Sequence, residues 1–149
     1  MQGPTGIGTS VRSAYPSSMD KHPAVETIPK GLTLSLTRHQ VVEGQEGEVD
    51  AWMAMLNRRA EECVATLDGE QMAIEAIFRL RDDAGDWLYW FELHGEGGGA
   101  ITGDHPIDRD HLEFAKRCKE PGHVAAEPLV LLLPRPVRQA IVSWVNERK

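Results

Sequence analysis

Even and odd positions differ in polarity within the segment 32–37. Leucine occupies every even position, and threonine or serine occupies every odd one. This two-residue period predicts a strand with one apolar and one polar face. Upstream, residues 1–29 contain scattered Gly, Ser, Pro and Thr without an apolar period. We therefore expect a disordered arm or leader over 1–29 and a folded domain over 30–133.

A helical spacing replaces the alternation after this strand. Between about residues 45 and 67, apolar side chains recur every three or four positions, which is typical of an amphipathic helix. The stripe consists of Val49, Trp52, Met53, Leu56, Ala60, Cys63, Val64 and Leu67. Alternating segments over 72–80 and 87–94 follow, separated by polar turn residues at 82–86. They predict a β-hairpin.

The second strand of this hairpin has large apolar side chains on both faces. Trp87, Tyr89 and Phe91 point one way, whereas Leu88 and Trp90 point the other. Helices on one side of a sheet would leave the second apolar face exposed. In a chain of this length, the natural cover is a second copy, so we expect a homodimer.

The remaining segments complete the expected fold. A glycine-rich loop over 95–104, interpreted as a flexible lid, precedes a helix expected from Asp108 to near Lys119. A buried strand is expected over 129–133, and a closing helix within the extension 134–149. The order predicts an α+β fold, namely a ferredoxin-like βαββαβ antiparallel sheet with helices on one face and an extra C-terminal helix.

Composition narrows the class of protein. The 149 residues carry a formal net charge of −7 and no lysine or arginine stripe, which argues against nucleic acid as a partner. No apolar run is long enough to span a bilayer, so no membrane association is expected. Cys63 and Cys118 both fall on apolar helix stripes, as expected for reduced thiols of a cytoplasmic protein.

Candidate chemistry is concentrated in the segment His105-Pro106-Ile107-Asp108-Arg109-Asp110-His111-Leu112-Glu113-Phe114. His111 lies in the apolar stripe of its helix, so its ring points toward the sheet. Two interpretations stay open: a core histidine bonded to a backbone or carboxylate group, or a cavity histidine suited to proton transfer. His105 is either an ordinary loop residue or a neighbour of His111. Asp108 stands where a helix N-cap is expected.

A carboxylate within the first hairpin strand is the second candidate. Glu75 either faces solvent or orients His111 or Arg59, because a buried carboxylate needs a partner. His105, Asp108 and His111 have the composition of a two-histidine, one-carboxylate metal set. Capping already accounts for Asp108, so we predict neither a metal nor a cofactor.

The chain resembles an uncharacterised family of small bacterial proteins over about 32–133. The resemblance rests on Trp52, Met53, Leu56, Asn57, Arg59, Glu75, Tyr89, Trp90 and the His-Pro-Ile-Asp-x-x-His-x-x-Phe segment. That family is similar to the dimeric α+β-barrel superfamily. The resemblance implies two sheets packed face to face and a small-molecule cavity between each sheet and its helices. The superfamily includes cofactor-free monooxygenases, haem-degrading enzymes, polyketide cyclases and binding proteins, so fold alone does not select a function.

The resulting hypothesis is an enzyme that acts on a small aromatic or polyketide-like metabolite by acid–base chemistry. His111 would be the acid or base, Glu75 would orient it, His105 would lie nearby, and Arg59 would hold an anionic oxygen. The other expected ligand-binding residues are Tyr89, Trp90, Trp52, Phe114 and Asp108. The alternatives are a non-catalytic ligand-binding or stress-related protein and, less favoured, a protein that handles haem or a metal.

Overall fold

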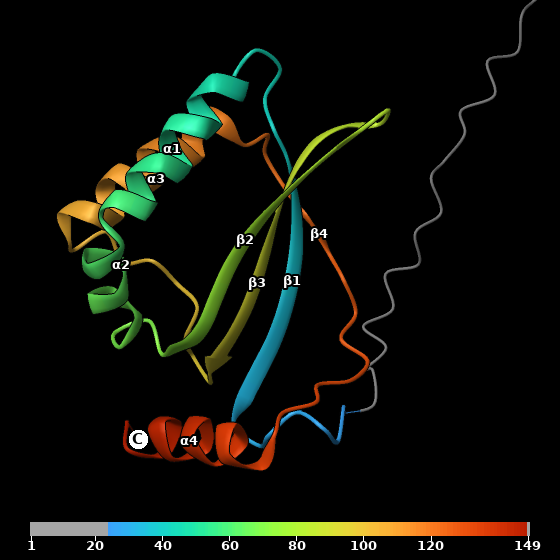
Figure 1. Cartoon of the computed structure of the whole chain (residues 1–149), viewed down its shortest axis with the longest axis vertical. Coiled ribbons are helices and arrows are strands. Elements are labelled where there is room, and N and C mark those ends of the chain that lie inside the picture. Colours follow the sequence, from blue (N-terminus) through green and yellow to red (C-terminus); the bar gives the residue numbers. More distant parts are fainter. Residues whose placement is uncertain (1–23, 149) are drawn as a thin grey trace, which may run out of the picture.

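The fold of residues 24–148, which are the residues the structure describes, combines an antiparallel sheet with helices (Figure 1). The structure is a computed structural model. In chain order the elements are β1 (Leu32–Gln40), α1 (Glu46–Arg58), α2 (Ala60–Leu67), β2 (Met72–Asp82), β3 (Gly85–Gly95), α3 (Pro106–Cys118), β4 (Val124–Ala125) and α4 (Arg135–Asn146). The α+β class expected from the sequence is confirmed.

The four strands are ordered β2-β3-β1-β4, and every neighbouring pair is antiparallel. Helices α1, α2 and α3 lie on one side of the sheet, and α4 crosses near one end of it (Figure 1). The long pairings are those of β3 with β1 and with β2. The short strand β4 pairs only with Thr37 and Arg38 of β1.

The two faces of the sheet differ sharply in composition. In the ladder, Trp90 lies opposite Thr37 and Ile77, whereas Phe91 lies opposite Leu36 and Ala76. Residues opposite one another share a face, so the alternation along β3 shows to which face each residue of β1 and β2 belongs. The face toward the helices, here called the covered face, contains Thr33, Ser35, Thr37, His39, Glu75, Ile77, Arg79, Leu88, Trp90, Glu92 and His94. The other, here called the open face, contains Leu32, Leu34, Leu36, Arg38, Gln40, Ile74, Ala76, Phe78, Leu80, Trp87, Tyr89, Phe91 and Leu93.

The expectation of large apolar groups on both faces of β3 is therefore confirmed. The polar half of β1, however, faces the helices, and its three leucines face away from them. A half-buried strand normally turns its apolar side toward the covering helices. This sheet does the reverse along β1.

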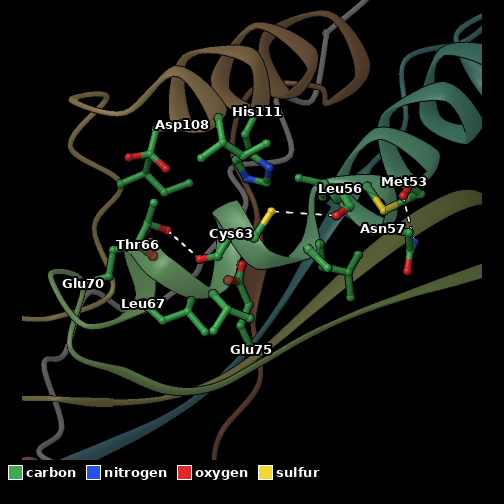
Figure 2. Close-up of a pocket in the computed structure, with 15 residues that line it drawn as sticks. Met53, Leu56, Asn57, Cys63, Thr66, Leu67, Glu70, Glu75, Asp108 and His111 are labelled. Carbon is green, nitrogen blue, oxygen red and sulfur yellow. Dashed lines mark hydrogen bonds between the residues drawn. The ribbon is translucent and has the colours of Figure 1, made fainter.

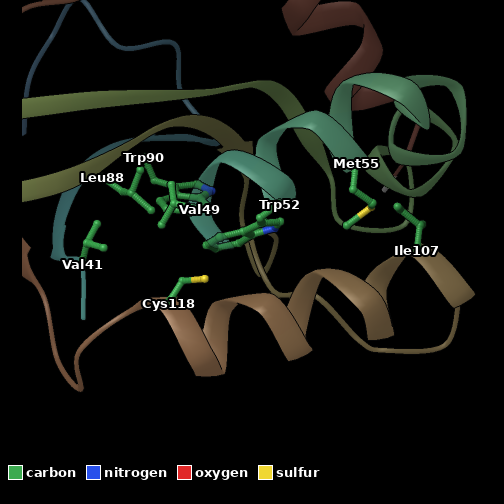
Figure 3. Close-up of a cluster of buried hydrophobic side chains, with 8 residues drawn as sticks. All are labelled: Val41, Val49, Trp52, Met55, Leu88, Trp90, Ile107 and Cys118. Atoms are coloured by element: carbon green, nitrogen blue, oxygen red, sulfur yellow. The ribbon is translucent and has the colours of Figure 1, made fainter. Parts of the chain in front are cut away.

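The apolar core fills one part of the space between the covered face and the helices (Figure 3). Trp52 of α1 and Leu88 of β3 are fully buried there, and the Trp52 and Trp90 rings lie 5.5 Å apart. The cluster consists of Val41, Val49, Trp52, Met55, Leu88, Trp90, Ile107 and Cys118. Cys63 and Cys118 are both free thiols, as expected.

The segment 129–133 was expected to be a buried strand, and that expectation is wrong. It contains no strand, and Leu129 and Leu132 are 76% and 79% exposed. The ladder with β1 continues only as far as the bond from the Ala126 amide to the Leu36 carbonyl, 2.8 Å. Pro128 follows and has no N–H to donate, which hinders further pairing.

The expected single helix over 45–67 is divided into α1 and α2. The break lies at Arg59, whose backbone (φ −106°, ψ 28°) leaves the helical region. Neither glycine nor proline stands there, so the sequence carries no recognised signal for the interruption. Within residues 24–148, no helix is both long and apolar enough to cross a membrane.

The arm expected over 1–29 falls mainly outside the described residues, but its last part is ordered. The Leu131 amide donates to the Thr27 hydroxyl (2.9 Å), and the Arg138 guanidinium donates to the Thr27 carbonyl (3.1 Å). Pro29 is fully buried. Residues 24–29 therefore belong to the folded part, and Thr27 binds the segment that leads into α4.

Candidate functional site

A cavity lies between the covered face and helices α1–α3. Two adjoining hollows make it up, one of about 340 Å³ and one of about 200 Å³; we call them the larger and the smaller lobe, and together the site cavity. Glu70, Glu75, Ile101 and His111 line both lobes. Figure 2 shows Glu75 rising from the sheet and His111 descending from α3 toward this space. Two of the residues expected to be catalytic are thus brought to one cavity.

His111 is held by an unexpected partner. The Trp52 indole Nε1–H donates to His111 Nδ1 at 3.2 Å, and the two rings meet edge to face with centroids 5.1 Å apart. Because an indole nitrogen can only donate, Nδ1 must carry a lone pair, and the neutral ring has its proton on Nε2. Burial, reinforced by the positive charge of Lys119, lowers the His111 pKa to about 4. His111 is therefore neutral at pH 7.

Glu75 is held by a second tryptophan. The Trp90 indole Nε1–H donates to Glu75 Oε1 at 3.1 Å. Burial raises the pKa of the Glu75 carboxyl, and the nearby charges of Glu70 and Glu92 add to the effect, while the Trp90 bond opposes it. Glu75 and Glu92 are direct cross-strand partners. Glu75 was expected to orient His111 or to pair with Arg59. Its hydrogen-bond partner is Trp90 instead.

Asp108 and Glu70 form a buried acidic end of the larger lobe. Their residues are only 5% and 7% exposed. The expectation that Asp108 caps its helix is wrong, because α3 begins at Pro106 with His105 at the N-cap position. Proline suits the first helical position, and this moves the helix start two residues upstream. Asp108 consequently lies in the first turn and lines the cavity.

The smaller lobe contains polar residues that sequence reasoning missed. His39 and Thr37 come from the polar half of β1, Glu92 from β3, and Lys119 from the end of α3. Burial, with the charges of Lys119 and His123, lowers the His39 pKa to about 4. Burial also lowers the pKa of Lys119, whose Nζ lies 4.7 Å from the centre of the Trp90 ring. The alternation in β1 could have identified His39 and Thr37 had the covered side been known.

Arg59 and Tyr89 are not brought to His111. The Arg59 guanidinium is bonded to two carboxylates outside the cavity. Its Nε lies 2.8 Å from Glu62 Oε1, and its Nη1 lies 2.5 Å from Asp110 Oδ2. Tyr89 lies opposite Arg38 and Phe78 and therefore belongs to the open face. Neither residue lines either lobe.

Phe114 and His105 also lie outside the cavity lining. Phe114 stacks on Trp52 with ring centres 6.2 Å apart, so it supports the tryptophan that holds His111. His105 is exposed at the start of α3. Within the described part of the chain, no group of three or more histidine, cysteine or acidic side chains is arranged to hold a metal ion.

The glycine-rich loop closes one wall of the cavity. The Gly99 amide donates to the Glu70 carbonyl at 2.9 Å, and Ile101 contributes to both lobes. At Gly98, an added Cβ would meet the Glu70 carbonyl oxygen at 2.5 Å and the Gln71 Cβ at 2.9 Å. Only glycine permits so close an approach. The loop is thus packed against the turn that precedes β2.

Comparison with known proteins places the chain in a family without assigning an activity. Residues 32–139 match a family of unknown function, DUF6176. The match covers most of the chain, and the protein therefore belongs to that family. No curated protein matches the chain.

Proposed function

We propose that this protein, a member of a family whose function is unknown, binds a small organic molecule in the site cavity and transfers a proton on it. The observation that carries the proposal is the pairing of His111 and Glu75. Both line the two lobes, and each is fixed by the N–H of a different buried tryptophan. Groups fixed in this way are preorganised for a reaction.

His111 is suited to donate a hydrogen bond rather than to remove a proton. Its Nδ1 lone pair is occupied by Trp52, and its pKa of about 4 leaves the ring neutral at pH 7. The proton on Nε2 is then available to an oxygen of the ligand. A neutral imidazole N–H can stabilise negative charge that develops on such an oxygen.

Glu75 is suited to move the proton. Its raised pKa brings the carboxyl closer to the range in which general acid–base catalysis is efficient at neutral pH. In the proposed step, the Glu75 carboxylate removes a proton from a carbon next to a carbonyl. The electron pair of the broken C–H bond moves onto the carbonyl oxygen, which the His111 Nε2–H stabilises. Return of a proton from Glu75 to the carbon regenerates the carbonyl compound, so one cycle of enolate formation and reprotonation exchanges the proton on that carbon.

Exchange with deuterated solvent tests this step. A panel of small ketones is incubated with the full-length protein in D₂O, and proton NMR follows loss of the signals next to the carbonyl. We expect faster exchange of at least one ketone than in buffer, and a loss of roughly 100-fold or more in Glu75→Gln. Glu113→Gln, which changes an exposed residue of α3 by the same chemistry, is the matched control. Binding of ketones without faster exchange would contradict proton transfer and leave a non-catalytic binding protein.

We further propose a ferredoxin-like fold that pairs as a dimeric α+β barrel. The element order and the strand order β2-β3-β1-β4 support the first part. The open face supports the second, because Phe78 and Leu80 are 60% and 49% exposed there. Two copies related by a two-fold axis would place this face against itself.

A further inference from the structure

We infer that the molecule bound in the larger lobe carries a positively charged nitrogen, as an organic ammonium or amidinium group, held by Asp108 and Glu70. The inference rests on the proposed binding function and specifies the class of its ligand. It replaces the anionic oxygen that the sequence had favoured with a group of opposite charge.

Asp108 supplies the more deeply buried carboxylate of the pair. Asp108 is only 5% exposed, and it lines the larger lobe. Among residues 24–148, no side chain or backbone group hydrogen-bonds or ion-pairs with its carboxylate. The Asp108 oxygens are not among the buried, unpartnered atoms of the described residues, so they remain accessible from the cavity and can pair with a cationic ligand there.

Glu70 lies at the same end of the cavity, as Figure 2 shows. It comes from the turn between α2 and β2, whereas Asp108 comes from α3, so two separate elements supply the two carboxylates. The Thr66 hydroxyl beside them donates to the Cys63 carbonyl at 2.9 Å. Thr66 is also a side-chain hydrogen-bond neighbour of Glu70, so Asp108 is the acid of the pair that lacks a partner among the described residues. Two adjacent acids in a partly closed lobe favour a positive charge between them.

Among the described residues, the lining of the larger lobe brings no competing cation, and His105, whose charge acts on Glu70, lies outside that lining. Neither lysine nor arginine lines the larger lobe among the described residues. Lys119 belongs to the smaller lobe, where Glu92 is the acid that acts on its charge, and Arg59 is paired outside the cavity. The walls beyond the acidic end are largely apolar and include Leu56, Ile77 and Ile107. This arrangement fits a molecule with an apolar body and a cationic end.

A metal ion fits these residues less well than an organic cation. Within residues 24–148, the acidic side chains do not converge with a third ligand in the geometry of a metal site. The apolar walls would also contribute nothing to a small hydrated ion. They would instead bury the hydrocarbon part of an amine.

Three probes of similar shape and different charge test the inference. Benzylamine is cationic at pH 7, benzyl alcohol is neutral, and benzoate is anionic. Binding of each to the full-length protein is measured by NMR titration. We expect benzylamine to bind at least about tenfold more tightly than benzyl alcohol, and benzoate to bind most weakly.

Isosteric variants locate the effect. Asp108→Asn and Glu70→Gln should each weaken benzylamine at least about tenfold while leaving benzyl alcohol nearly unchanged. Glu113→Gln, with the same loss of charge on the exposed side of α3, should leave all three affinities unchanged. Circular dichroism spectra matching that of the unmodified protein would confirm that the variants fold.

The outcomes separate the two proposals. Equal or tighter binding of benzyl alcohol or benzoate would overturn the cationic ligand while leaving the binding cavity intact. Unchanged benzylamine affinity in both Asp108→Asn and Glu70→Gln would overturn it as well. Failure of all three probes to bind would contradict the proposed binding function itself, and the inference would fall with it.

Discussion

The covered and open faces of the sheet reverse the usual distribution of polarity. The covered face contains Glu75, Glu92 and His39 beneath the helices, whereas the open face presents leucine and aromatic side chains. A polar face cannot form a dry core along its whole length, since each buried polar group needs a partner. The core therefore occupies the part around Leu88 and Val49, and the cavity occupies the part around Glu75.

The two proposals together give the two faces separate tasks. The covered face combines a packed core with a cavity whose polar groups are aligned by Trp52 and Trp90. The open face is mainly apolar, with Arg38 and Gln40 at one end of β1, and leaves Phe78 more than half exposed. On this account, chemistry belongs to the covered face and assembly belongs to the open one.

The largest expected effect contrasts a leucine of each face. Leu88→Ala should lower the free energy of unfolding by about 2–5 kcal/mol, because Leu88 is fully buried in the core. This loss should not depend on protein concentration. Leu80→Ala should destabilise the protein only at concentrations where the proposed dimer forms. Urea unfolding at two protein concentrations measures both effects. The same dependence of stability on concentration in the two variants would contradict the distinction between the faces.

A charge placed on the open face should separate the copies. Phe78→Lys is expected to convert a dimer to a monomer, because an ammonium group would be buried without a partner at the interface. Size-exclusion chromatography with light scattering reports the mass. Leu112→Lys, which places the same charge on a partly exposed position of α3, is the control and should remain dimeric. A monomeric unmodified protein would disprove the role given to the open face.

Removal of the Glu75 charge should change how stability depends on pH. The raised pKa means that the folded state holds this proton more tightly than the unfolded chain does. Glu75 therefore costs stability as pH rises through its folded-state pKa, and this cost is absent at pH values below the ordinary carboxyl range. Glu75→Gln should be more stable than the unmodified protein at pH 7 and similar to it near pH 3. Chemical unfolding at both values checks the sign, and a variant that is less stable at pH 7 would contradict it.

The smallest effect is expected at Arg59. Its ion pairs with Glu62 and Asp110 lie at partly exposed positions where water screens them, so Arg59→Ala should change the stability of the protein only slightly. Ligand affinity should not change, because Arg59 does not line the cavity. Calorimetry of benzylamine binding to Arg59→Ala checks this. A marked loss of affinity would contradict the placement of Arg59 outside the cavity.

The local sequence pattern predicted where the strands lie better than it predicted what packs around them. Alternation located β1, β2 and β3 because it reflects the strand period itself. The apolar run 129–133 also looked like a buried strand, but burial needs an adjacent strand to pair with, and Pro128 hinders that pairing. The break at Arg59 depends on packing of α1 and α2 and has no signal in the local sequence.

The site was only partly predictable for a related reason. His111 and Glu75 stood out because each is a polar group at a position that periodicity makes internal. The partners Trp52 and Trp90 come from distant elements, and no spacing rule connects them to these groups. His39, Glu92 and Lys119 were missed because the polar half of a strand normally faces solvent, and only the tertiary arrangement shows that helices cover it here.

A crystal structure of the full-length protein, purified without added ligand at neutral pH, would test the central claim most directly. We expect His111 Nε2 and the Glu75 carboxylate to face one open cavity, each still bonded to its tryptophan, with the open face packed against a second copy. A cavity closed by side chains, with His111 Nε2 bonded to a backbone carbonyl, would contradict the division of tasks between the two faces.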